Sequence, residues 1–160
     1  MHRTILLLAL LTVFCGGLSA GDGNLDRATL RGLKALNIVI DPLDQQLEKA
    51  GLSADTLKAR IDTRLRHAGI PIDNNAIQFV GLRIDSAMLP KKGPYGLCFL
   101  LAFYQPVILS RDQKIRTATQ TWDVHTMLVV MPKSMVDAAL DTVDQITDQF
   151  VTAYRSVNPQ

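Results

Sequence analysis

The chain has 160 residues, of which 48% are hydrophobic and 20% are charged, and its formal net charge at pH 7 is +2. A charge so close to neutrality lacks the basic footprint of a nucleic-acid-binding protein. Two cysteines are too few for a disulfide-stapled scaffold, whereas the length is enough for one domain with its own hydrophobic core.

The first twenty residues have the pattern of an export signal. His2 and Arg3 supply the positive start, residues 5–14 form an apolar run, and Leu18-Ser19-Ala20 ends in small residues that suit cleavage before Gly21. The run is about ten residues long, whereas a membrane-spanning helix needs roughly 20. We therefore predict that residues 1–20 are a signal peptide that is removed. The mature protein would then lie in the periplasm or outside the cell, without a transmembrane span.

The two cysteines have different expected fates. Bacterial lipoproteins carry lipid on a cysteine that follows small residues, whereas Val13 and Phe14 precede Cys15. We therefore expect no lipid anchor at Cys15, which is discarded with the signal. Cys98 then has no intramolecular partner for a disulfide. We expect it to be buried in a strand, with pairing to another chain as the alternative.

The mature chain begins with segments of mixed character. Residues 21–32 are polar and glycine-rich at the start, which predicts a mobile lead. Residues 33–40 end in β-branched residues and predict the first strand, which Asp41-Pro42 stops. Residues 44–50 predict a helical turn closed by Gly51.

A helix is predicted between Ser53, a good N-cap, and Gly69, which suits a helix end. Its buried stripe recurs at helical spacing: Leu57, Ile61, Leu65 and Ala68. Its basic residues fall mainly on other faces: Lys58, Arg60, Arg64 and Arg66. We interpret them as a solvated face partly balanced by Asp55 and Asp62, with a phosphate or anionic-lipid surface as the alternative.

Three further strands and a final helix follow. Residues 77–84 predict a strand whose core face carries Val80, Leu82 and Ile84, and a glycine- and proline-containing loop covers 86–96. Residues 97–109 and 115–130 predict an antiparallel hairpin around a polar turn at 110–114. Pro106 indicates an edge or a bulge. Ser134 starts a long amphipathic helix, closed by Asn158-Pro159, whose apolar stripe is Val136, Leu140, Val143, Ile146, Phe150, Tyr154 and Val157.

The predicted element order is β-α-β-β-β-α. A helix between the first two strands favours a right-handed crossover and parallel pairing, and the later strands form an antiparallel meander. Both helices have a single apolar stripe, so we expect them on the same face of one sheet. The sequence thus predicts a single α+β domain over 33–160, with a mixed four-stranded sheet and two helices on one face.

This architecture, together with the export signal, resembles small envelope domains of Gram-negative bacteria. Examples are the lipopolysaccharide-assembly lipoprotein of the outer membrane and the N-terminal domain of the periplasmic Tol–Pal propeller protein. Three local stretches, at residues 30–33, 64–70 and 148–151, resemble uncharacterised exported bacterial proteins. The resemblance implies an envelope location, and it carries no catalytic or ligand-binding residue to this chain.

The hairpin register predicts which side chains share a face. If Leu109 opposes Ile115, then Leu100 and Ala102 share the helix-covered face with Trp122, Val124 and Leu128. The opposite face then carries the candidate partner or ligand surface: Phe99, Leu101, Phe103, Val107, Thr121, Asp123 and His125. An exposed apolar patch of this kind commonly marks a binding site. The alternative is that residues 21–32 or the 86–96 loop cover it.

No catalytic, metal-ligating or cofactor-binding residue is predicted. His67 and His125 lack metal-ligand spacing to Cys98. The same register puts Cys98 and His125 on opposite faces, which argues against a nucleophilic triad with Asp123. The paired aspartates at 141, 144 and 148 are interpreted as an exposed acidic helix face, with acid–base or calcium chemistry as the alternative.

The function predicted from the sequence is that of a non-enzymatic periplasmic or secreted accessory protein. It would bind an envelope protein or lipid through the open sheet face, without nucleic acid or a cofactor. The alternatives are an exported small-ligand carrier and an exported enzyme with an unrecognised site. Self-association also stays open.

Overall fold

The computed structural model describes residues 21–88 and 93–159, so the predicted signal peptide and Cys15 lie outside the described residues. A four-stranded sheet has the order β1-β2-β3-β4. The elements are α2 (Asn24–Ala28), β1 (Asn37–Ile40), α3 (Gln45–Lys49), α4 (Ala54–His67), β2 (Phe79–Met88), β3 (Tyr95–Leu109), β4 (Asp112–Val130), the 3₁₀ turn η2 (Pro132–Ser134) and α5 (Met135–Val157).

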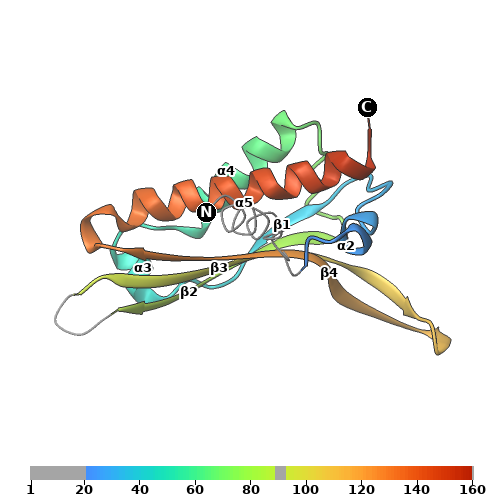
Figure 1. Cartoon of the computed structure of the whole chain (residues 1–160), viewed down its shortest axis with the longest axis horizontal. Coiled ribbons are helices and arrows are strands. Elements are labelled where there is room, and N and C mark those ends of the chain that lie inside the picture. Colours follow the sequence, from blue (N-terminus) through green and yellow to red (C-terminus); the bar gives the residue numbers. More distant parts are fainter. Residues whose placement is uncertain (1–20, 89–92, 160) are drawn as a thin grey trace, which may run out of the picture.

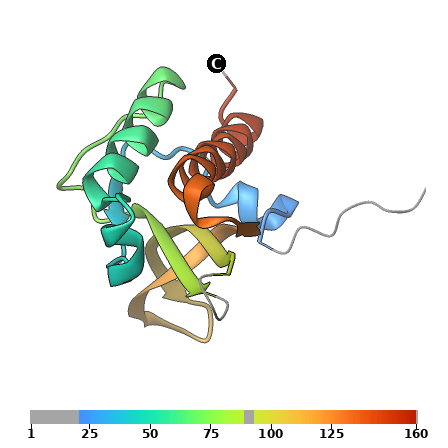
Figure 2. The ribbon, with the colours of Figure 1, turned by 90° about the vertical axis from the view of Figure 1, so that its left-hand side faces the viewer.

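The sheet and helices form two layers (Figure 1). β1 pairs with β2 in parallel, and the other neighbouring strands are antiparallel. The long helices α4 and α5 lie beside each other on one face of the sheet (Figure 2). The predicted α+β class, mixed sheet and common helix face are confirmed, the helical turn predicted at 44–50 is α3, and α2 is an additional short helix.

The helices form where their capping residues and apolar stripes place them. The Ser53 hydroxyl accepts a hydrogen bond from the Thr56 backbone N–H at 3.2 Å, and Gly69 follows α4 at φ +79°. Three stripe residues of α4 are fully buried: Leu57, Ile61 and Leu65. They share one core with the α5 stripe, in which Phe150 meets the edge of the Trp122 ring with 5.1 Å between centroids. The stripes therefore hold the helices on the sheet.

Residues 21–32 pack on the fold, whereas the sequence predicts a mobile lead there. Leu30 is fully buried in the core. The Asn158 side chain donates to the Leu30 carbonyl at 2.9 Å and accepts from the Gly32 N–H at 2.7 Å. The first strand is correspondingly short, because residues 33–36 leave this turn without pairing along β2.

The hairpin turn is tighter than predicted. Ser110 and Arg111 form a two-residue turn, so β4 begins at Asp112 and not at Ile115. The outer part of the hairpin, residues 105–120, extends beyond the last residue of β3 that pairs with β2, and we call it the arm (Figure 1). Pro106 lies in the arm, where no strand of the described residues pairs on the other side of β3, in agreement with its predicted edge position.

A β-bulge at Thr121 reverses the predicted faces of β3. In the arm, Val107 opposes Thr117, as the sequence-based register requires. The register shifts by one between Phe103 and Tyr104, so Phe103 opposes Trp122 and Thr121 has no partner. A shift of one residue turns every following side chain to the other face, because side chains alternate along a strand.

The predicted exposure of three apolar site residues is therefore wrong. Phe99, Leu101 and Phe103 point into the core beneath the helices, and each is at most 1% exposed. Leu100 and Ala102, which the sequence assigned to the core face, lie on the opposite side with His125 and Asp123. The predicted faces of β2 and β4 are correct, since Val80, Leu82, Trp122 and Val124 are buried.

Candidate binding surface

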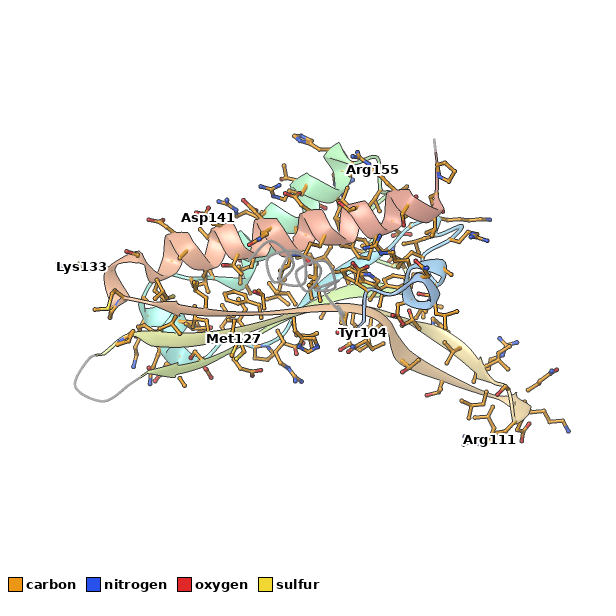
Figure 3. All side chains as sticks on the ribbon, viewed as in Figure 1. Tyr104, Arg111, Met127, Lys133, Asp141 and Arg155 are labelled. Atoms are coloured by element: carbon orange, nitrogen blue, oxygen red, sulfur yellow. The ribbon has the colours of Figure 1, made fainter. Side chains whose placement is uncertain are left out.

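The side of the sheet away from α4 and α5 is the candidate site, and we call it the outer face. Pairing places its residues in rows across the strands, such as Arg83, Leu100 and His125. The next row toward the 88–95 connection contains Asp85, Cys98 and Met127. Figure 3 shows Met127 and Tyr104 on the side of the sheet opposite Asp141 and Arg155 of α5.

One end of the outer face is apolar and open to solvent. Met127 is 79% exposed and Val129 is 73% exposed, and both alternate along β4 with the core-facing Leu128. Cys98, across from Met127, is a free and exposed cysteine, so the prediction that it is buried is wrong. Its strand is apolar on both faces, so the sequence pattern alone does not tell which face the Cys98 side chain lies on. The register of β3 against β4 decides it.

An aromatic pair borders the other end of the outer face. The rings of Phe79 and Tyr104 stack with 4.9 Å between centroids and 17° between planes. They lean over Gly81, where an added Cβ would lie 3.1 Å from the Tyr104 ring. The hollow beside the pair has a volume of about 160 Å³ and is also lined by Val39, Leu100, Asp41 and Arg83.

An Arg–Asp ion pair and a His–Asp contact lie among the polar residues of this face. Arg83 Nε is 3.3 Å from Asp41 Oδ2 beside the hollow. His125 Nε2 is 2.9 Å from Asp123 Oδ2 at the β4 edge. The outer face therefore combines an apolar end with charges of both signs.

The predicted site residues separate into four environments. Asp123 and His125 lie on the outer face, as predicted. Three residues of β3 lie in the core instead: Phe99, Leu101 and Phe103. Val107 lies half-buried in the arm. Thr121 lies at the bulge, where its hydroxyl accepts a hydrogen bond from Gln105 at 2.9 Å. The sequence analysis missed Met127 and Val129, although their alternation with Leu128 and Val130 identifies them.

Cys98, His125 and Asp123 share the outer face without forming a nucleophilic triad. Cys98 lies across from Met127, which follows His125 along β4, whereas Asp123 precedes it. The His125 ring is bound to Asp123, so it is directed away from the row of Cys98. No hydrogen bond joins Cys98 to His125 within the described residues, and these contain no metal-binding group of three or more ligands.

The charged faces of α4 and α5 bind each other, which the sequence analysis missed. Arg60 Nε donates to Asp144 at 3.0 Å, and Arg64 Nε lies 2.8 Å from the same carboxylate. Arg64 also donates to Asp148 at 2.8 Å. The two arginines therefore already have anionic partners, which disfavours the alternative of an anion-binding surface on α4.

Asp144 is the strongly perturbed acid of this cluster. Burial alone would raise the pKa of its carboxyl, but hydrogen bonds from Arg60 and Arg64 outweigh burial and lower that pKa to about 2. The same hydrogen bonds raise the pKa of both arginines. Only 13% of the Asp144 side chain is exposed, so it is not part of an exposed acidic face as predicted. It stays ionised and joins the helices.

Comparisons with known proteins add names but no assignment. No protein-family model matches the chain, and no curated protein is similar to it. A minor lipoprotein of Acinetobacter baumannii aligns over 75% of this chain and 91% of its own, with 12% identity and a TM-score of 0.37. PelC of Paraburkholderia phytofirmans, solved as a dodecamer, aligns over 72% and 84%, with 10% identity and a TM-score of 0.40. Scores this low assign neither family nor function.

Among the described residues, no helix is both long enough and apolar enough to span a bilayer.

Proposed function

We propose that the protein is an exported accessory protein that binds a partner protein through the apolar end of its outer face. The observation that carries the proposal is the exposure of Met127 and Val129, which alternate with core-facing residues of β4, and Figure 3 shows Met127 on the sheet face away from α5. Together with the exposed Cys98 they form a continuous apolar surface across β3 and β4. Exposed apolar patches of this kind mark interaction sites.

The position of this surface favours a protein over a lipid. β4 is the last strand of the sheet: among the described residues β3 is the strand that pairs with it, and one backbone bond, from Asp123 to Gly21, lies on its other edge. An edge strand offers unpaired backbone N–H and C=O groups to an added strand, which a protein can supply and a lipid cannot. Met127 and Val129 lie along this edge, so a partner strand would meet both side chains and backbone.

The carrier alternative has less support. Sites for small ligands usually enclose roughly 300–1,000 Å³. The hollow beside Phe79 and Tyr104 measures about 160 Å³. It therefore suits a side chain of a partner better than a whole ligand.

Two substitutions test the proposed surface. Met127→Asp and Val129→Asp place a charge in the apolar end without touching the core, and each should weaken partner binding at least tenfold because an unpaired charge is desolvated. The measurement is native mass spectrometry of each protein recovered from its own envelope. Leu25→Asp, at a position that is 86% exposed on α2, is the matched control.

The proposal requires a co-purifying chain that the two outer-face variants lose and Leu25→Asp keeps. If both outer-face variants retain that chain, the apolar end of the outer face is not the partner-binding site. A small-molecule adduct in place of a chain supports the carrier function instead.

A further inference from the structure

We propose that cleavage before Gly21 creates a free α-amino group that binds the Asp123 carboxylate and fixes the mature N-terminus on the sheet edge. This inference rests on the proposed export. It assigns Asp123 and its surroundings as the binding site for the chain's own processed end.

The backbone already places Gly21 on Asp123. The Asp123 N–H donates to the Gly21 carbonyl at 3.0 Å, which extends the pairing of β4 by one bond. Gly21 has φ +88°, and a Cβ there would lie 2.2 Å from Asp123 Oδ1 and 2.6 Å from Oδ2. Only glycine fits both the backbone conformation and the approach to the carboxylate.

The same geometry puts the Gly21 nitrogen beside the carboxylate. In any residue the backbone nitrogen is about 2.5 Å from the Cβ position, so the Gly21 nitrogen lies within about 5 Å of Asp123 Oδ1. After cleavage no residue precedes this nitrogen, so rotation about the Gly21 Cα–C bond can bring it to the carboxylate while the Gly21 carbonyl keeps its hydrogen bond to the Asp123 N–H. The terminal ammonium carries three donors and can then form a charge-assisted hydrogen bond with Asp123.

The next residue anchors the segment. The Asp22 carboxylate accepts a hydrogen bond from Trp122 Nε1 at 2.7 Å and two from Arg27 at 2.8 Å and 2.6 Å. Its side chain is only 12% exposed. Gly21 is thus held between this anchor and β4, which keeps its nitrogen near the Asp123 carboxylate.

Asp123 has a place for a permanent cation. Its side chain is 14% exposed, and its one ion-pair partner in the described residues is His125, which is 64% exposed. A histidine side chain, unlike an ammonium group, is not a permanent cation. Before cleavage the Gly21 nitrogen is an uncharged amide, and after cleavage it becomes the missing cation.

Processing would therefore strengthen the folded protein. The new pair ties residues 21–32 to the sheet, and with them the buried Leu30. Acetylation of the terminus restores the uncharged amide of the precursor, which allows the pair to be switched off without any change of sequence.

The test compares thermal unfolding in a two-by-two cycle that combines the state of the N-terminus with the residue at position 123. The mature chain starting at Gly21 is compared with its N-acetylated form, in the wild type and in Asp123→Asn. We expect acetylation to lower the wild-type Tm by about 2–4 °C, as the loss of one such pair does in a domain of this size. In Asp123→Asn the two forms should agree within about 1 °C. His125→Gln is the control and should keep the full acetylation effect.

Two results would overturn this inference, one for the ion pair and one for the cleavage. An equal Tm loss in wild type and Asp123→Asn overturns the pairing, because a steric effect of the acetyl group persists without the carboxylate. N-terminal mass spectrometry of the exported protein must find Gly21 first, and a different first residue overturns the cleavage on which the inference rests. Partner binding by the outer face is measured separately, so its failure leaves this result standing.

Discussion

Asp144 shows how single side chains join the two long helices. It accepts hydrogen bonds from Arg60 and Arg64, which lie one turn apart on α4. Its neighbour Asp141 approaches Arg60 only to 3.9 Å and is 82% exposed. Two acids on one helix face therefore differ in role because one lies in the α4–α5 contact and the other faces water.

The cluster predicts a pH dependence of stability. The pKa of Asp144 is lowered from an ordinary 3.8 to about 2, so its stabilisation is present above pH 4 and is lost as the pH falls toward 2. Asp144→Asn should lower the free energy of unfolding at pH 7 by about 2 kcal/mol, with a smaller effect at pH 3. Urea unfolding at both pH values measures this.

Asp141→Asn is the matched control for that experiment. An exposed ion pair contributes about 0–1 kcal/mol, so this variant should stay close to the wild type at both pH values. An effect of Asp144→Asn that is the same at pH 3 and pH 7 would contradict the assigned role of its charge.

Among the strands that carry the candidate site, β3 is the one whose buried face the sequence pattern does not predict. The faces of β2 and β4 follow from alternation, because apolar residues recur at every second position: Val80, Leu82 and Ile84, then Trp122, Val124 and Leu128. β3 is apolar at almost every position from 97 to 103, so alternation assigns it no face. Its face depends on the register, which the turn and the bulge determine.

The bulge itself has no signal in the sequence. Thr121 stands between Gln120 and Trp122 in a polar run that looks uniform. In the structure it lies beside the packed 21–32 segment, where the Thr121 carbonyl accepts from Thr29 at 3.3 Å. The bulge is therefore in contact with a residue 92 positions away in the sequence, and local patterns do not contain such a contact. The candidate site changed from Phe99 and Phe103 to Met127 and Val129 for this reason.

Adjacent residues of β3 test the register directly. Phe99→Ala removes a buried ring and should cost about 3–5 kcal/mol of unfolding free energy, whereas Leu100→Ala on the outer face should cost less than about 1.5 kcal/mol. Urea unfolding of the two variants gives the order. A larger loss of unfolding free energy for Leu100→Ala than for Phe99→Ala would contradict the bulge and support the register predicted from the sequence.

At the scale of the whole molecule, the two layers differ in how they meet solvent. On the helix side, α4 and α5 pair their charges with each other, and Asp141 faces water. On the outer face, Met127 and Val129 remain exposed. The helix side is thus polar and solvated, whereas the outer face has an exposed apolar end, and that end is the part that gains from a partner.

Site-specific photocrosslinking in the producing cell tests the outer-face account most directly. A photoreactive side chain at Met127 or Val129 would lie on the outer face, and one at Asp141 would lie on the helix side as the matched control. If the outer face binds the partner, we expect positions 127 and 129 to crosslink to the same envelope protein and position 141 not to crosslink to it. Crosslinking of that protein at 141 alone, or equally at all three positions, would contradict binding through the outer face.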